Sequence, residues 1–111
     1  MKKRSSYSVI WSEAAASDLQ DIVEFIAGES QPSARVLFGV LKRRAGTLAS
    51  FPLRGRLVPE FEAIGLDIYR ELVVSPYRLI FRVKGRHVFV MAVFDGRRDL
   101  EDIFFERLTR R

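Results

Sequence analysis

The chain has 111 residues, of which 48% are hydrophobic, and this predicts one compact domain over residues 1–111 with a single core. It contains no cysteine, which excludes disulfides and thiolate metal sites, and no apolar run approaches the roughly 20 residues that cross a membrane. The 19 Lys and Arg residues outnumber the 14 Asp and Glu residues, and the charge of +5 favours an anionic partner, either nucleic acid or an acidic protein.

The first half of the chain predicts a strand followed by two helices. Residues 7–11 are β-prone, and Ser12 fits the N-cap of a helix whose apolar stripe continues to about Ala27, where a glycine ends it. A second helix begins with Pro32 in its first turn and stops before Pro52. We expect these two helices to pack as an antiparallel hairpin.

The second half predicts an irregular connection, three strands and a short helix. Residues 52–68 have two prolines and two glycines without a clean period, with room for one short strand near Leu57. Alternating apolar residues then predict a meander of three strands over residues 69–74, 77–84 and 87–94. The third strand is apolar on both faces, as expected in the middle of a sheet that is covered on both sides. Asp99 fits the N-cap of the final helix.

The order of these elements predicts an α+β domain. It consists of an N-terminal strand, an antiparallel helical hairpin packed on an antiparallel sheet with the three-strand meander, and a short C-terminal helix. The composition further predicts a cytoplasmic protein that binds no metal and no other cofactor, and that does not associate with a membrane.

Strand alternation raises a question about the stretch SPYRLIFRVKG, residues 75–85. It places Arg78, Ile80 and Arg82 on one face and a set of apolar and aromatic residues on the other. We expect the aromatic face to pack under the helical hairpin and the arginine face to stay partly open. Open guanidinium groups suit contacts with carboxylates or phosphates, although a solvated, solubilising face would look the same in the sequence.

Three stretches together carry a wider pattern, namely WSEAAASDLQDIVEFIA, FPLRGRLVPE and RELVVSPYRLIFRVKGRHVFVMAVFDGRRDL. They resemble the RelE/ParE superfamily of toxins from bacterial type II toxin–antitoxin modules, and within it the ParE-like branch, over about residues 7–104. The resemblance implies the fold derived above. It also implies a cognate antitoxin, ParD-like or RelB-like, that neutralises the toxin in a hetero-oligomer.

The resemblance leaves the cellular target open. ParE-like members are associated with inhibition of DNA gyrase and are not nucleases, whereas RelE-like members cleave mRNA in the ribosomal A site. We expect a ParE-like toxin that inhibits gyrase by protein binding. A ribosome-dependent mRNA endonuclease and a non-toxic degenerate member that still binds antitoxin are the alternatives.

The residues that the resemblance would assign to RNA cleavage are incomplete. Arg78 and Arg98 match two arginines of RelE-like enzymes, but Phe104 stands where those enzymes have a tyrosine. His87 is the only histidine, and a lone histidine beside a hairpin turn is more often simply exposed. We therefore assign no catalytic residue, and Arg78, Arg98 and His87 are candidates only for the nuclease alternative.

Two sets of residues are candidates for binding partners. The stretch GRRDL, residues 96–100, matches a ParE-like motif and also fits a turn followed by a helix cap. Phe25 and Phe38 fall off the core stripes of the hairpin and are expected to contact the antitoxin. The candidate contacts with the target or another anion are Arg70, Arg78, Arg82, Arg97 and Arg98.

Overall fold

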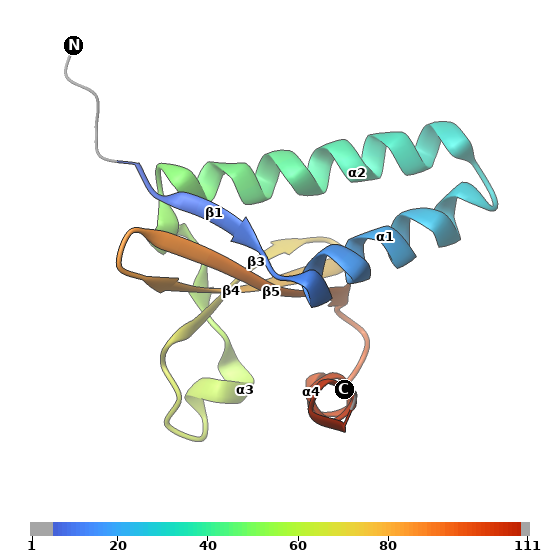
Figure 1. Cartoon of the computed structure of the whole chain (residues 1–111). Helices are drawn as coiled ribbons and strands as arrows, with labels where there is room; N and C mark the ends of the chain where they lie inside the picture. The colour runs from blue at the N-terminus through green and yellow to red at the C-terminus, as the bar shows by residue number, and fades with distance from the viewer. Residues whose placement is uncertain (1–5, 110–111) are drawn as a thin grey trace, which may run out of the picture.

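A computed structural model of the chain describes residues 6–109 and shows a mixed five-stranded sheet with helices on both faces (Figure 1). The order across the sheet is β1-β5-β4-β3-β2; β1 runs parallel to β5, and the other neighbouring strands are antiparallel. The strands are β1 (Ser8–Trp11), β2 (Arg56–Leu57), β3 (Tyr69–Val74), β4 (Tyr77–Lys84) and β5 (His87–Asp95). The helices are α1 (Glu13–Ala27), α2 (Gln31–Gly46), α3 (Pro59–Glu62) and α4 (Leu100–Thr109).

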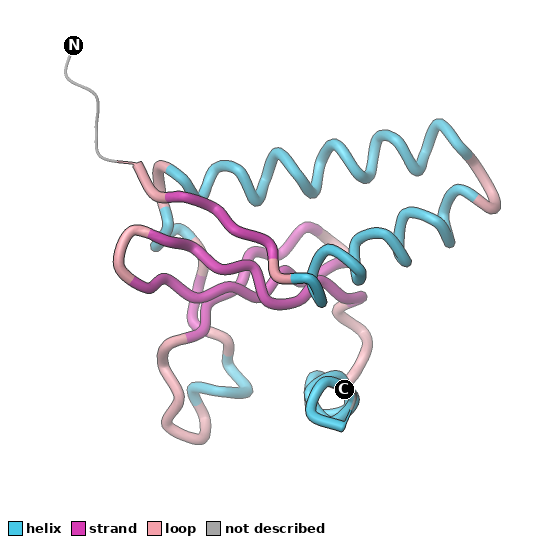
Figure 2. Tube along the Cα trace, in the orientation of Figure 1, coloured by secondary structure: helices cyan, strands magenta, loops and turns pink. Residues whose placement is uncertain are grey.

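Both helices of the hairpin begin at a capping serine; Ser12 was predicted as a cap, and Ser30 was not. Ser12 Oγ accepts a hydrogen bond from the backbone N–H of Ala15 at 3.0 Å, and Ser30 Oγ accepts one from Ser33 at 3.2 Å, which satisfies amides that a helix start leaves free. Pro32 lies in the first turn of α2, as predicted. In Figure 2 the long helices lie together on one side of the magenta sheet, and α3 and α4 lie on the other.

The sheet separates two apolar clusters, and β4 contributes to both. Leu79 and Phe81 are fully buried against the hairpin, whereas Ile80 is fully buried on the side of α3 and α4. The alternation predicted for this strand is therefore confirmed. The hairpin-side cluster includes Ala15, Leu19, Leu41, Ala45, Leu48, Val88 and Val90. The opposite cluster consists of Val58, Phe61, Ile80, Ala92, Phe94, Leu100 and Ile103.

The predicted α+β class and the antiparallel meander of β3, β4 and β5 are confirmed. The sheet as a whole is mixed because β1 joins it beside β5 in parallel, and β2 extends it at the other end, near Leu57 where room for a short strand was noted. β5 lies between β1 and β4 and is covered on both faces, as its continuous apolar sequence predicts. The four-residue helix α3 was not predicted, because one turn is too short to show a period.

Candidate functional site

Arg78 is enclosed rather than open to solvent. Its Nε donates to Glu71 Oε1 at 2.6 Å, and its Nη1 and Nη2 donate to the two carboxylate oxygens of Glu60 at 2.8 Å each. Its guanidinium also lies over the Phe94 ring, 5.4 Å from the centroid, and only 13% of the side chain is exposed. The expectation of an open arginine face is wrong at this position, because α3 brings Glu60 over the strand.

The carboxylate of Glu71 explains why an arginine is held inside the fold. Its side chain has no solvent exposure, and Arg56 Nε donates to its second oxygen at 2.6 Å. A buried carboxylate requires such partners, since burial without them costs several kcal/mol, on the order given for buried ions. The hydrogen bonds to Glu60 raise the pKa of Arg78, and those from Arg78 lower the pKa of Glu60. Arg78 is therefore charged and neutralised internally.

Among the five arginines predicted to contact a target, the two after β5 are exposed. The side chain of Arg97 is 83% exposed and that of Arg98 is 50% exposed. Arg97 Nη2 donates to Asp95 Oδ2 at 2.5 Å, and this hydrogen bond lowers the pKa of Asp95 to about 2. Arg98 Nη2 lies 3.4 Å from Glu106 Oε1 on α4. Both guanidinium groups can be approached by an incoming partner at the cost of weak surface ion pairs.

The remaining predicted contacts, Arg70 and Arg82, are half-buried. Arg70 Nη1 donates to the carbonyl oxygen of Gly55 at 2.8 Å and so fixes the loop before β2. Arg82 lies between Tyr69 and Phe89 on the neighbouring strands, and its Nε is buried without a hydrogen-bond partner in the described part of the chain. Arg70 is thus partly structural, whereas no hydrogen bond within the described residues holds the Arg82 side chain in place.

The candidates for the nuclease alternative do not converge. Arg78 pairs with Phe94 near the end of β5, while His87 is at the start of that strand. His87 and Phe94 are seven positions apart along β5, which is roughly 20 Å at the usual rise per residue. His87 is exposed, with its ring 5.8 Å from that of Phe89. Phe104 is half-buried, with its ring 4.8 Å from that of Phe61, so the corresponding position is apolar as well as without a hydroxyl.

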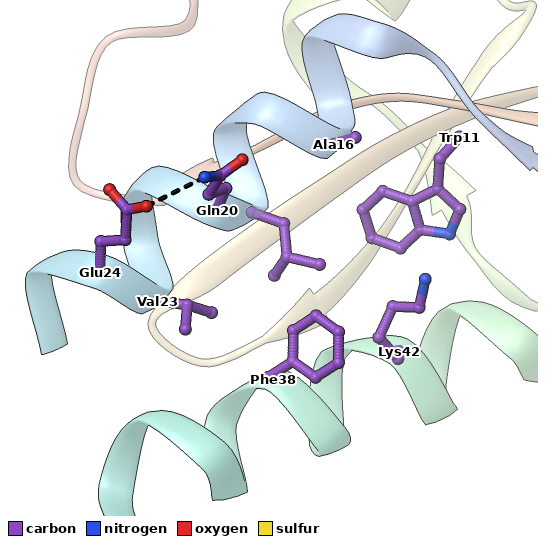
Figure 3. A pocket seen from close by; sticks show the side chains of 8 residues that line it. Trp11, Ala16, Gln20, Val23, Glu24, Phe38 and Lys42 are labelled. Carbon is purple, nitrogen blue, oxygen red and sulfur yellow. Dashed lines mark hydrogen bonds between the residues drawn. The ribbon is translucent and has the colours of Figure 1, made fainter. Parts of the chain in front are cut away.

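A groove of about 520 Å³ opens between β1, α1 and α2 (Figure 3). Leu19 and Val23 form its wall on α1, Phe38 and Lys42 come from α2, and Trp11 comes from β1. Lys42 Nζ lies 5.0 Å from the centroid of the Trp11 ring and 5.8 Å from that of Phe38. The groove is therefore mainly apolar and aromatic, with Lys42 on α2 and the hydrogen-bonded Gln20 and Glu24 on α1 as its polar lining.

The groove distinguishes between the two phenylalanines that were predicted to contact the antitoxin. Phe38 is 46% exposed and lines the groove, whereas Phe25 is 73% exposed and is not among the lining residues. Both are exposed as expected. Trp11 and Lys42 were not predicted from the sequence, although a tryptophan at the end of a β-prone stretch next to a helix cap was a usable signal.

The described residues contain no cluster of His, Asp and Glu that could hold a metal ion. Within the same residues 6–109, none of the helices combines the length and the apolar character that crossing a membrane requires.

Residues 9–100 match the family described as the ParE toxin of the type II toxin–antitoxin system, parDE. The chain belongs to the ParE toxin family. No curated protein gives a significant match. The fold resembles that of the chromosomal ParDE system from P. aeruginosa, with a TM-score of 0.67 and 22% identity over 80% of this chain and 95% of the other. It also resembles the toxin–antitoxin complex RelBE2 from Mycobacterium tuberculosis, with a TM-score of 0.58 and 23% identity over 86% of this chain and 97% of the other.

Membership of the ParE family confirms the resemblance seen in the sequence, and the two structures confirm the fold. In this ParE toxin the hairpin groove and the turn after β5 that carries Arg97 and Arg98 are two exposed features with binding character. The ion-paired Arg78, by contrast, belongs to the interior.

Proposed function

We propose that this ParE-family toxin inhibits DNA gyrase by binding it, with no nuclease chemistry of its own. The observation that carries the proposal is the enclosure of Arg78. Three of its N–H groups are bonded to Glu60 and Glu71, and its side chain is 13% exposed. RNA cleavage through the 2′-hydroxyl needs cations that can approach the phosphate, and this arginine has no such freedom.

The placement of the other nuclease candidates supports the same proposal. General acid–base catalysis requires the acid, the base and the phosphate-binding cation to surround one scissile bond. His87 is roughly 20 Å from Arg78 along the strand, and Phe104 has an apolar ring in an apolar cluster. A binding function needs none of these groups to converge.

We propose that the groove between β1, α1 and α2 binds the antitoxin, which the family membership implies. A groove between two helices accepts an amphipathic helix that inserts apolar side chains. Phe38 and Trp11 are the aromatic anchors on this side, and Phe25 extends the contact along the outside of α1. Toxin and antitoxin then form a hetero-oligomer, and the proposal places it in the cytoplasm with gyrase.

The target-binding surface in this proposal is the arginine turn after β5, formed by Arg97 and Arg98, with Arg82 as a further contact. Exposed guanidinium groups suit the carboxylates of an acidic protein surface. Arg70 contributes indirectly, because it holds the Gly55 loop.

The deciding experiment compares two activities of the purified chain. Inhibition of gyrase supercoiling, relieved by the antitoxin, is the expected result. Primer extension on ribosome-bound mRNA after induction should show no new 5′ ends. A-site cuts that disappear in Arg98→Ala would establish the endonuclease alternative, and the absence of both activities together with retained antitoxin binding would establish a non-toxic member.

A further inference from the structure

Among residues 6–109, β1 is the terminal strand of the sheet and pairs with β5 alone. Its other edge therefore has no neighbouring strand in the described part of the chain. Ser8 N–H donates to Arg86 O at 2.9 Å and Ser12 N–H donates to Val90 O at 3.0 Å, so the even-numbered residues face β5. Because hydrogen-bonding groups alternate between the two edges of a strand, Val9 and Trp11 direct theirs away from the sheet.

The outward-facing backbone groups of this edge are free after Tyr7 in the described part of the chain. Tyr7 N–H donates to Ala49 O at 2.9 Å, which closes the start of this edge. Over residues 6–109, neither Val9 nor Trp11 forms a hydrogen bond outside the pairing with β5. Two N–H and two C=O groups are therefore available to an added strand, and such an unprotected edge is the usual template for strand addition.

The free edge is continuous with the groove described above. Trp11 belongs to both, since its backbone lies on the edge and its side chain lines the groove (Figure 3). Lys42 lies over the same indole ring. A polypeptide bound in the groove would therefore have neighbouring residues close enough to pair with the free edge.

We propose that a segment of the antitoxin adds to this edge as a sixth strand, hydrogen-bonded to Val9 and Trp11, next to the segment that fills the groove. This inference rests on the proposed binding of the antitoxin. The backbone bonds supply affinity that does not depend on sequence, and the groove supplies selection for side chains.

Charge favours an acidic antitoxin segment over a second copy of this chain. Each copy carries a net charge of +5, so two copies repel each other, whereas an acidic segment would be attracted and would find Lys42 beside Trp11.

The test uses a proline at position 9, because proline lacks the N–H that the added strand needs. The Val9 N–H faces outward, so Val9→Pro removes no bond to β5, and edge strands tolerate proline. Val9→Ala is the matched control, since it shortens the same side chain and keeps the N–H. With the protein encoded beside this gene as the probe, Val9→Pro should bind at least about tenfold more weakly than Val9→Ala.

Residue-resolved amide exchange gives a second readout that does not depend on a variant. In the wild-type complex the amides of Val9 and Trp11 should gain protection, while those of Ile10 and Ser12, already bonded to β5, should change little. Equal affinity of the two variants with no gain at Val9 would overturn the inference and leave antitoxin binding intact. Protection of Val9 in the free protein with a doubled mass would assign the edge to self-pairing. Failure of the wild-type chain to bind the neighbouring protein would remove both proposals.

Discussion

The Nε of Arg78 lies 2.6 Å from Oε1 of Glu71, whose side chain is completely shielded from solvent. This relationship makes Arg78 a stabilising residue. Arg78→Ala should lower the free energy of unfolding by about 3 kcal/mol, because Glu71 would stay buried with Arg56 as its one remaining arginine partner. Arg98→Ala, at an exposed position, should change it by less than about 0.5 kcal/mol. Urea unfolding measures both, and equal stability of the two variants would contradict the assignment.

The ion pair between Glu60 and Arg78 should make stability depend on pH. The hydrogen bonds from Arg78 hold the pKa of Glu60 below its ordinary value of 4.5. A depressed folded-state pKa means that the stabilisation is fully present above the unfolded-state pKa and is lost as the pH falls through the folded-state pKa. Glu60→Gln should therefore reduce the loss of stability between about pH 5 and about pH 3.

The size of this effect is limited, because 41% of the Glu60 side chain is exposed and solvent screens the pair. Glu62→Gln on the same short helix is the matched control. If both variants lose stability with acid as steeply as the wild-type chain does, the Glu60 pair does not contribute.

The groove should respond to substitutions of its lining and not of its surroundings. Phe38→Ala removes an aromatic side chain that lines the groove, and the affinity for the antitoxin should fall by about 1–3 kcal/mol. Val36→Ala on the same helix is the control, since Val36 is 66% exposed and is not among the lining residues. Calorimetric titration of the antitoxin into each variant gives the comparison. A larger loss for Val36→Ala would move the interface to the outer face of α2.

Gyrase inhibition should depend on where positive charge is removed. A triple alanine variant of Arg82, Arg97 and Arg98 should inhibit supercoiling less, by about 1–3 kcal/mol for each ion pair that is desolvated at the target. The control removes the same charge from the helical hairpin and replaces Arg35, Arg43 and Arg44, which are exposed on α2. Thermal melts establish that both variants are folded. Full inhibition by the first variant would exclude these arginines from the target contact.

Asp18 should anchor α4 to the rest of the fold. Its Oδ2 accepts a hydrogen bond from the backbone N–H of Val93 at 3.0 Å and pairs with Arg107, whose Nη1 donates to Met91 O at 2.9 Å. Asp18→Ala should lower stability by about 1–3 kcal/mol, because it leaves a partly buried N–H without its acceptor. Asp21→Ala, at an exposed position on the same helix, is the control. Differential unfolding in urea distinguishes them.

The sequence by itself determined the elements whose signals are local. Ser12 and Pro32 predicted the starts of the two long helices, and period-two alternation predicted which residues of β4 face the hairpin. These predictions succeeded because a cap, a fixed proline φ or an alternating strand imposes its conformation through neighbouring atoms. The family resemblance followed from the same stretches.

Only the tertiary structure decided which charges and apolar side chains are free. Alternation placed Arg78 beside Ile80 on one face, but it did not reveal that α3 would cover that face. Glu60 is 18 residues away from Arg78 in the chain and arrives through a single turn of helix. The groove likewise depends on Trp11 meeting Phe38 from a separate element. The same charge pattern in a sequence is compatible with a solvent-exposed side chain and with one paired to a distant carboxylate. The long-range packing of the chain determines which of the two forms.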